Sequence, residues 1–199
     1  MPTKRLAVIL AIGVSLLGGA VAAQHASPRV VVDTELGQIE LELDATRAPA
    51  TVANFLRYVD EQFFDGTSFY RTVTAGNQPD TLIKIEVIQG GADGGKGAHE
   101  PIGLEPTSVT GLKHVDGAVS MARNARDTAT SEFFICVGDQ PELDFGGRRN
   151  PDGQGFAAFG RVVKGAEVVK LIHQRAADRQ RLAPPVTIRS IRRVPRGGR

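Results

Sequence analysis

The 199-residue sequence has no tryptophan and a single cysteine, Cys136. One cysteine excludes an internal disulfide, so the fold must be stabilised by packing. Cys136 lies inside an apolar run, Phe133 to Val137, which favours a buried core thiol over a nucleophile. The sequence also lacks a G-x-S-x-G motif, and hence the nucleophile elbow of a serine hydrolase. It has no heptad pattern and no internal repeat, which excludes a coiled coil and a solenoid.

The sequence also lacks the usual patterns of metal-binding and nucleotide-binding sites. The four histidines are spread widely, at His25, His99, His114 and His173, without the close spacing of a metal site. The glycine-rich segment from Gly90 to Gly97 resembles a phosphate-binding loop, but Gly97 stands where the motif requires serine or threonine. We therefore expect no metal and no cofactor, and we interpret this segment as a set of turns.

The N-terminus has the layout of a secretory signal peptide. Lys4 and Arg5 precede an apolar run from Leu6, which ends in small residues around Ala22 and Ala23. We predict a signal peptide over residues 1–23, cleaved after Ala22 or Ala23, and a linker over 24–29. The alternative is an uncleaved membrane anchor, because the run approaches the roughly 20 residues that span a bilayer.

Cleavage would change the charge balance. It removes Lys4 and Arg5, leaving 22 of the 24 basic residues against 22 acidic ones. Basic residues then concentrate at the C-terminus, where we predict a basic tail over residues 194–199. This tail is interpreted as a solvated end, with attraction to an anionic surface as the alternative. No aromatic platform accompanies the charge, so nucleic acid is not expected as a partner.

The pattern of the remaining chain predicts one mainly β domain over residues 30–193. Val30 to Val32 begin a strand, a turn follows at Leu36 and Gly37, and Gln38 to Leu43 alternate with period two. An amphipathic helix is expected from Pro49, and a second from Ala166 to about Ala176. Further strands are expected at Ser68–Val73, Lys84–Ile88, Gly117–Ala122, Glu132–Val137, Gly155–Val163 and Val186–Ile191. This outline is a β-barrel with two helices covering its ends. Taken alone, Arg71 near the end of a strand indicates a surface or ion-pair residue.

Six segments together resemble the cyclophilin family of peptidyl-prolyl isomerases, in order and over nearly all of the mature chain. They are Ala48–Phe55, Phe69–Arg71, Ile88–Gly91, Val119–Ala122, Ser131–Cys136 and Phe159–Val162. The resemblance implies a closed eight-stranded antiparallel β-barrel capped by two α-helices. It also implies Arg71 as the catalytic arginine and Gln89 as the residue that orients it. The implied proline pocket comprises Phe134, Met121, Leu143 and Phe156, while Ala122 and Arg123 lie along the groove for the preceding residue.

The sequence departs from the family pattern at three places. Glu132 replaces a common glutamine, and we expect it to form a bidentate pair with Arg71. The link from Thr72 to Glu86 is longer than usual, and Glu86 replaces an aromatic residue of the pocket wall. We expect Val87 or a residue of 81–85 to substitute. Glu142 stands where sensitive members have tryptophan, which predicts weak cyclosporin binding.

The leading hypothesis is a monomeric, cofactor-free isomerase that acts on proline-containing polypeptides in a bacterial periplasm. Arg71, Gln89 and Glu132 form the expected catalytic group. The first alternative is a proline-peptide binding module or chaperone of low activity. The second is a membrane-tethered scaffold, which requires an uncleaved N-terminal segment; after cleavage we expect no stable membrane insertion.

Overall fold

The structure is a computed structural model that describes residues 27–195. The predicted signal peptide over 1–23, the first part of the 24–29 linker and the end of the 194–199 tail lie outside the described residues. The α-helices are α1 (Pro49–Asp60), α2 (Thr107–Thr110) and α3 (Ala166–His173). The strands are β1 (Arg29–Thr34), β2 (Gly37–Leu43), β3 (Ser68–Val73), β4 (Val87–Gly91), β5 (Ala118–Met121), β6 (Phe133–Cys136), β7 (Ala157–Lys164), β8 (Ala177–Asp178) and β9 (Arg181–Arg193).

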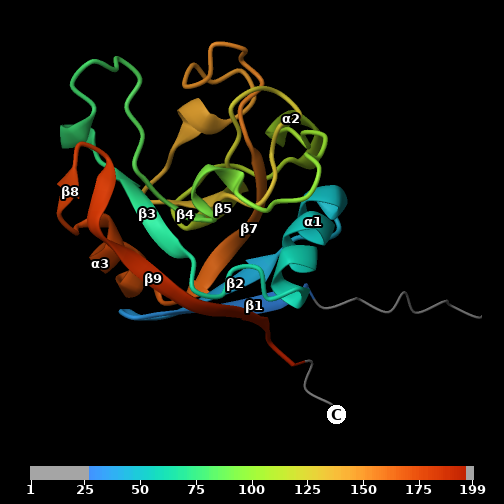
Figure 1. Cartoon of the computed structure of the whole chain (residues 1–199). Coiled ribbons are helices and arrows are strands. Elements are labelled where there is room, and N and C mark those ends of the chain that lie inside the picture. The colour runs from blue at the N-terminus through green and yellow to red at the C-terminus, as the bar shows by residue number, and fades with distance from the viewer. Residues whose placement is uncertain (1–26, 196–199) are drawn as a thin grey trace, which may run out of the picture.

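Eight of these strands close into an antiparallel barrel, as predicted. The order around the barrel is β1-β2-β7-β5-β6-β4-β3-β9, and β9 pairs again with β1 (Figure 1). β8 adds only a two-residue hairpin to β9. Within residues 27–195, closure leaves no long unpaired edge, which removes the main route to edge-to-edge aggregation.

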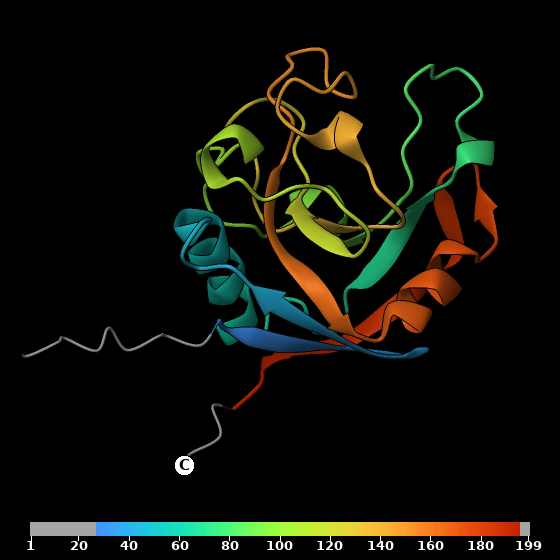
Figure 2. The same cartoon turned by 180° about the vertical axis from the view of Figure 1, so that it is seen from behind.

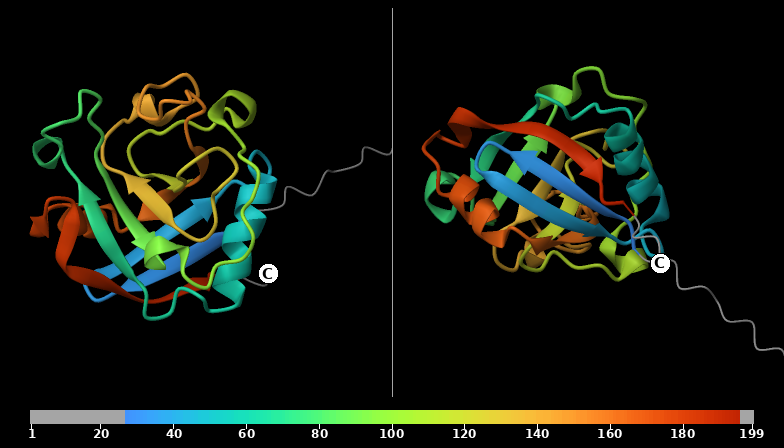
Figure 3. Two further views of the ribbon diagram at one scale, coloured as in Figure 1. Left: turned by 45° about the horizontal axis from the view of Figure 1, so that its top comes forward. Right: turned by 90° about the horizontal axis from the view of Figure 1, so that it is seen from below.

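The two expected helices lie on opposite sides of the barrel (Figures 1 and 3). Pro49 occupies the first turn of α1, where its missing N–H costs nothing. The buried face of α1 includes Val52, Phe55 and Val59, and α3 buries Val168 and Ile172. Both faces join the same apolar cluster inside the barrel, so burial of these stripes fixes the helices on the sheet.

Strand alternation divides the apolar residues between two faces. In β6, Phe133 and Ile135 belong to the large interior cluster, whereas Phe134 and Cys136 belong to a smaller cluster on the other face. Phe133 packs edge-on against Phe55, with ring centroids 5.4 Å apart. The smaller outer cluster forms the apolar part of the site described below.

Several element boundaries differ from those predicted. A third helix, the four-residue α2, was not predicted, α3 ends at His173 rather than near Ala176, and β4 begins at Val87 rather than Lys84. β9 begins at Arg181 rather than Val186 and runs through Pro184 and Pro185. Both prolines are exposed and lie where the β3–β9 register shifts, so their missing N–H groups break no ladder. Among residues 27–195, no helix is long and apolar enough to cross a membrane.

Candidate active site

A row of side chains crosses three neighbouring strands on the outer face of the barrel. Arg71 of β3 lies opposite Gln89 of β4, and Gln89 lies opposite Phe134 of β6. Antiparallel pairing places directly opposite residues on the same face of a sheet. The register therefore brings a guanidinium, an amide and an aromatic ring side by side, although 63 positions separate the first from the last.

Two amide oxygens orient the guanidinium of Arg71. Its Nη1 donates to Oε1 of Gln89 at 2.7 Å. Its Nε and Nη2 donate to Oε1 of Gln180 at 3.0 and 2.6 Å. Burial, and secondarily the charge of Arg149, lowers the pKa of Arg71 from its ordinary value, but an arginine in a protein stays protonated. The site thus holds a fixed cation whose charge is not neutralised by its partners.

The predicted pair between Glu132 and Arg71 does not form, although both residues are described. Instead, Oε1 of Glu132 accepts hydrogen bonds from the Tyr70 hydroxyl at 2.6 Å and from the backbone N–H of Gly94 at 2.9 Å. The Tyr70 hydroxyl in turn accepts a bond of 2.6 Å from Nε2 of Gln89. Glu132 therefore acts on Arg71 through Tyr70 and Gln89, and the expectation of a bidentate ion pair is wrong.

An apolar wall stands beside the cation. Phe134 meets the ring of Phe156 edge-on at a centroid distance of 5.3 Å. Ile85, Val87 and Leu143 complete the wall and are almost fully buried. The wall and the row of polar side chains bound one groove of about 490 Å³. As expected, residues 85 and 87 supply the wall that the altered position Glu86 does not.

The groove contains every predicted site residue except one. Arg71, Val87, Gln89, Ala122, Arg123, Glu132, Phe134, Leu143 and Phe156 line it. Met121 does not, because it belongs to the cluster inside the barrel and lies opposite Phe133 in the β5–β6 ladder. Strand alternation sends Met121 inward, so its assignment to the proline pocket is wrong.

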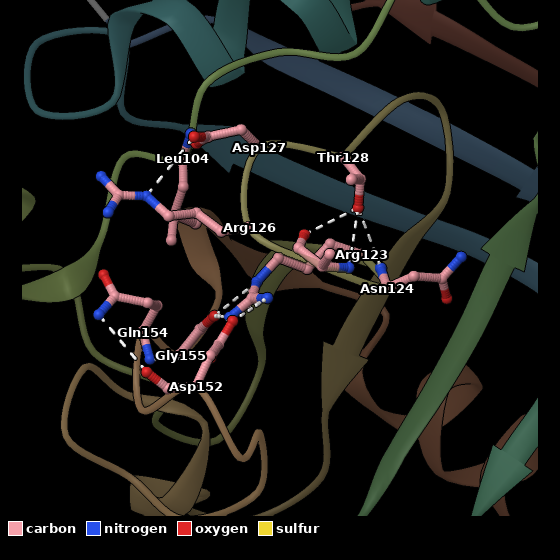
Figure 4. A network of polar contacts seen from close by, with 10 residues as sticks. Leu104, Arg123, Asn124, Arg126, Asp127, Thr128, Asp152, Gln154 and Gly155 are labelled. Atoms are coloured by element: carbon pink, nitrogen blue, oxygen red, sulfur yellow. Dashed lines mark hydrogen bonds and ion pairs between the residues drawn. The ribbon is translucent and has the colours of Figure 1, made fainter.

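Arg123 lines the groove, but its guanidinium is engaged in holding a loop. Nη1 and Nη2 bind both carboxylate oxygens of Asp152 at 2.8 and 3.0 Å, and Nε donates to the carbonyl of Gly155 at 2.8 Å (Figure 4). The hydrogen bonds from Arg123 lower the pKa of Asp152 to about 2. The same guanidinium lies 5.2 Å from the centroid of Phe156, within range of a cation–π interaction. Arg123 therefore fixes the position of Phe156.

A histidine braces Phe134 from behind, a contact that sequence reasoning missed. The ring of His114 stacks on Phe134 at a centroid distance of 5.9 Å. Its Nδ1 bonds Oδ1 of Asp144 at 2.8 Å, and its Nε2 bonds Oγ of Ser120 at 3.0 Å. This resembles a serine–histidine–aspartate triad, but Ser120 is 0% exposed. The group thus has a supporting role, because Oγ cannot reach a substrate.

Two loops meet at the rim of the groove, and sequence reasoning missed their contact. The loop between β3 and β4 and the loop before β7 rise from the same side of the barrel (Figures 1 and 2). Arg149 joins them: its Nη1 donates to Oε1 of Gln78 at 3.0 Å and to the carbonyl of Ile83 at 2.8 Å. Glu142 does not line the groove, because it pairs with Arg148 at 2.8 Å. No spacing or motif connects these residues in the sequence.

A barrel with a half-buried arginine beside an aromatic pocket defines a cyclophilin-like protein, and comparison with known proteins agrees. The model of the family "Cyclophilin type peptidyl-prolyl cis-trans isomerase/CLD" matches residues 29–193. The chain therefore belongs to the cyclophilin-type peptidyl-prolyl cis-trans isomerase family, and its enzyme class is that of a peptidyl-prolyl cis-trans isomerase.

Curated relatives and a solved structure are similar over most of the chain. Peptidyl-prolyl cis-trans isomerase A of Dickeya dadantii is 37% identical over 179 residues, covering 86% of this chain and 85% of the relative. Peptidyl-prolyl cis-trans isomerase B of Escherichia coli is 37% identical over 155 residues, covering 75% and 87%. A Cryptosporidium parvum cyclophilin, crystallised in the presence of the dipeptide Ala-Pro, superposes with a TM-score of 0.69 at 22% identity and covers 84% of this chain and 99% of that one. At that identity the solved structure supports the fold alone.

Proposed function

We propose that this chain accelerates rotation about peptide bonds preceding proline in exported polypeptides, with Arg71 stabilising the twisted bond. The observation that carries the proposal is the orientation of Arg71 by two neutral amide oxygens, Gln89 and Gln180, beside the apolar wall around Phe134. Neutral acceptors orient a guanidinium without cancelling its charge. Proline-containing polypeptides are the substrates that membership of the family implies.

The chemistry requires no bond cleavage. Partial double-bond character gives the peptide C–N bond a barrier of about 18–20 kcal/mol. A donor near the imide nitrogen favours the twisted form, in which that nitrogen becomes pyramidal and can accept a hydrogen bond. A hydrogen bond from a charged group contributes about 1.5–3 kcal/mol, and each 1.36 kcal/mol off the barrier is about tenfold in rate. Arg71 would thus supply about a ten- to hundredfold acceleration of the rotation.

The apolar wall would supply the remaining acceleration. A preformed surface for the proline ring is made by Phe134, Phe156 and Leu143. Arg123 and His114 hold this surface in place without being part of it. Acceleration requires that this surface bind the twisted state better than either planar isomer. No step in this mechanism needs a cofactor or a metal.

Export is the part of the proposal that rests on the sequence alone. Lys4, Arg5 and the apolar run ending at Ala22 and Ala23 support cleavage and release into a periplasm or a similar compartment. N-terminal sequencing of the chain recovered from the cell envelope tests this. A first residue at Ala23 or Gln24 is expected, whereas a retained Met1 would support the tethered scaffold.

The test of the catalytic proposal is a prolyl isomerisation assay on the wild type and Arg71→Ala. We expect the wild type to accelerate isomerisation, and Arg71→Ala to lower kcat/KM about ten- to a hundredfold. Circular dichroism and thermal unfolding would check that the variant folds. A wild type without activity that still binds proline peptides would favour the low-activity binding module. Equal activity in both proteins would refute the role of Arg71.

A further inference from the structure

The groove is lined by more positive than negative charge. Among the described residues that line it, Arg71, Arg123 and Arg149 face a single carboxylate, Glu132. Arg123 is paired with Asp152 through two hydrogen bonds. Glu132 accepts bonds from Tyr70 and Gly94. Arg71 and Arg149 are therefore left without a carboxylate partner in the part of the chain that the structure describes.

Arg149 is the arginine of this pair that the proposed catalytic step does not use, and it has donors to spare. Only its Nη1 is engaged, by Gln78 and Ile83. Its Nε and Nη2 make no hydrogen bond to residues 27–195. Its neighbour Arg148 is different, because it pairs with Glu142 outside the groove and is 71% exposed. Of these two consecutive arginines, Arg148 is therefore paired with a carboxylate on the surface, whereas Arg149 lies at the groove without a carboxylate partner among the described residues.

The electrostatic environment of Arg149 at the groove is unfavourable. Burial lowers its pKa, and no carboxylate among residues 27–195 opposes this effect. Its charge also acts on Arg71, whose pKa it lowers. A partly desolvated charge without a partner is costly, and an anion that enters the groove would offset part of this cost. The planar guanidinium fork suits a carboxylate.

We propose that Arg149 makes the groove selective for substrates that carry a carboxylate on the residue immediately before or immediately after the proline. The carboxylate can belong to an aspartate or glutamate side chain, or to the C-terminus of the polypeptide. This inference rests on the proposed isomerase function and specifies its substrate class. Arg71 would act on the twisting bond. Arg149 would bind the neighbouring carboxylate and so raise the substrate's occupancy of the groove.

Matched peptides test the preference. Acetylated and amidated peptides would carry Glu or Gln immediately before the proline, or immediately after it. A further pair of Gln peptides would end one residue after the proline in a free carboxylate or an amide. The kcat/KM of each would be measured by NMR exchange and corrected for its uncatalysed rate. We expect at least one carboxylate peptide to exceed its neutral partner by about three- to tenfold, and the ratio to fall as salt is raised.

Variants assign the preference to Arg149. Arg149→Gln should bring the ratio close to one, and Arg149→Glu should reverse it. Arg148→Gln removes the same charge one residue away, outside the groove, and should leave the ratio unchanged. If the Arg149 variants do not fold, the salt dependence in the wild type and the charge-preserving Arg149→Lys variant, which should retain a ratio above one, still test the inference.

The outcomes separate this inference from the proposed function. Acceleration of neutral peptides together with a ratio of one for all carboxylate peptides would overturn the carboxylate preference and leave the isomerase intact. A preference that survives Arg149→Gln would also overturn it. A preference only for the free C-terminus would support it and identify the source of the carboxylate. Failure to accelerate any peptide would refute the isomerase itself.

Discussion

At the scale of single residues, the guanidinium of Arg71 is oriented by amides and not by a carboxylate. Gln180 accepts two of its hydrogen bonds and Gln89 accepts a third. Glu132 lies two hydrogen bonds beyond Gln89, on the far side of the Tyr70 hydroxyl. The cation at the centre of the groove is therefore held in place while its charge remains available to a substrate.

Gln180 is a positioning residue, and its removal should impair activity without affecting the fold. We expect Gln180→Ala to lower kcat/KM about three- to tenfold, because it removes both neutral bonds to one edge of the guanidinium. Gln174→Ala, at an exposed position, is the matched control. In an Arg71→Ala background, Gln180→Ala should have no further effect. An equal loss with and without Arg71 would indicate a purely structural role.

At the scale of elements, α1 depends on a distant residue for its N-terminal cap. Ala48, at the N-cap position, provides no side-chain hydrogen bond. Glu105, from the segment before α2, accepts from the N–H groups of Ala50 and Thr51 at 3.1 and 2.8 Å and from the Thr51 hydroxyl at 2.6 Å. A carboxylate at this end also interacts favourably with the helix dipole.

Loss of this cap should destabilise the protein. We expect Glu105→Ala to lower the free energy of unfolding by about 1–2 kcal/mol, as other N-cap losses do. Glu100→Ala, at an exposed position in the same segment, is the control. Urea unfolding of both variants measures the difference. Equal midpoints for the two would show that the Glu105 contacts contribute no net stability.

The stability that the loop before β7 contributes should depend on pH through the ionisation of Asp152. Hydrogen bonds from Arg123 lower the folded-state pKa of Asp152 from 3.8 to about 2. A lowered pKa adds stability that is present above the unfolded-state value and lost as the pH falls through the folded-state value. Asp152→Asn should therefore lower Tm at neutral pH, and the difference from wild type should shrink as the pH falls from about 4 to about 2.

Thermal unfolding between pH 2 and pH 7 measures this dependence. Asp80→Asn, at an exposed position in the other rim loop, is the control. Its Tm should differ little from that of the wild type at every pH in this range. A difference between wild type and Asp152→Asn that stays constant over this range would contradict a stabilising ionised pair.

At the scale of the whole molecule, the only cysteine reports on global unfolding. Cys136 is 1% exposed, and burial raises the pKa of its thiol above the ordinary value. Because the thiolate is the reactive form, we expect no alkylation by iodoacetamide in the native state and complete alkylation in denaturant. Rapid labelling of the native protein would show that the barrel opens locally at β6.

The aromatic packing around Phe133 inside the barrel should set the denaturant concentration at which Cys136 is half labelled. Phe133 packs against Phe55, Phe64 and Phe69. We expect Phe133→Ala to destabilise the barrel by about 3–5 kcal/mol and to shift Cys136 labelling to lower denaturant. Leu82→Ala, at a side chain that is 99% exposed, should leave the midpoint unchanged.

The sequence by itself determined most of the elements of this protein, but not α2 or β8. Alternation in Gln38 to Leu43 and the helical spacing from Pro49 predicted β2 and α1 with nearly the observed bounds. These are local signals, because the period of apolar residues reflects the geometry of a single strand or helix. The family resemblance added the closed eight-stranded topology and seven of the residues that line the groove. Val87 and Glu132 were inferred from departures from the family pattern.

Only the tertiary structure decided which faces and which distant residues meet. Period two shows that Met121 and Ala122 point in opposite directions, but pairing with Phe133 decided that Met121 lies inside. Arg71 and Gln180 are 109 positions apart, and no local pattern links them. Pairing of β3 with β9 brings them together, since its register sets Arg71 opposite Arg181, the residue that follows Gln180.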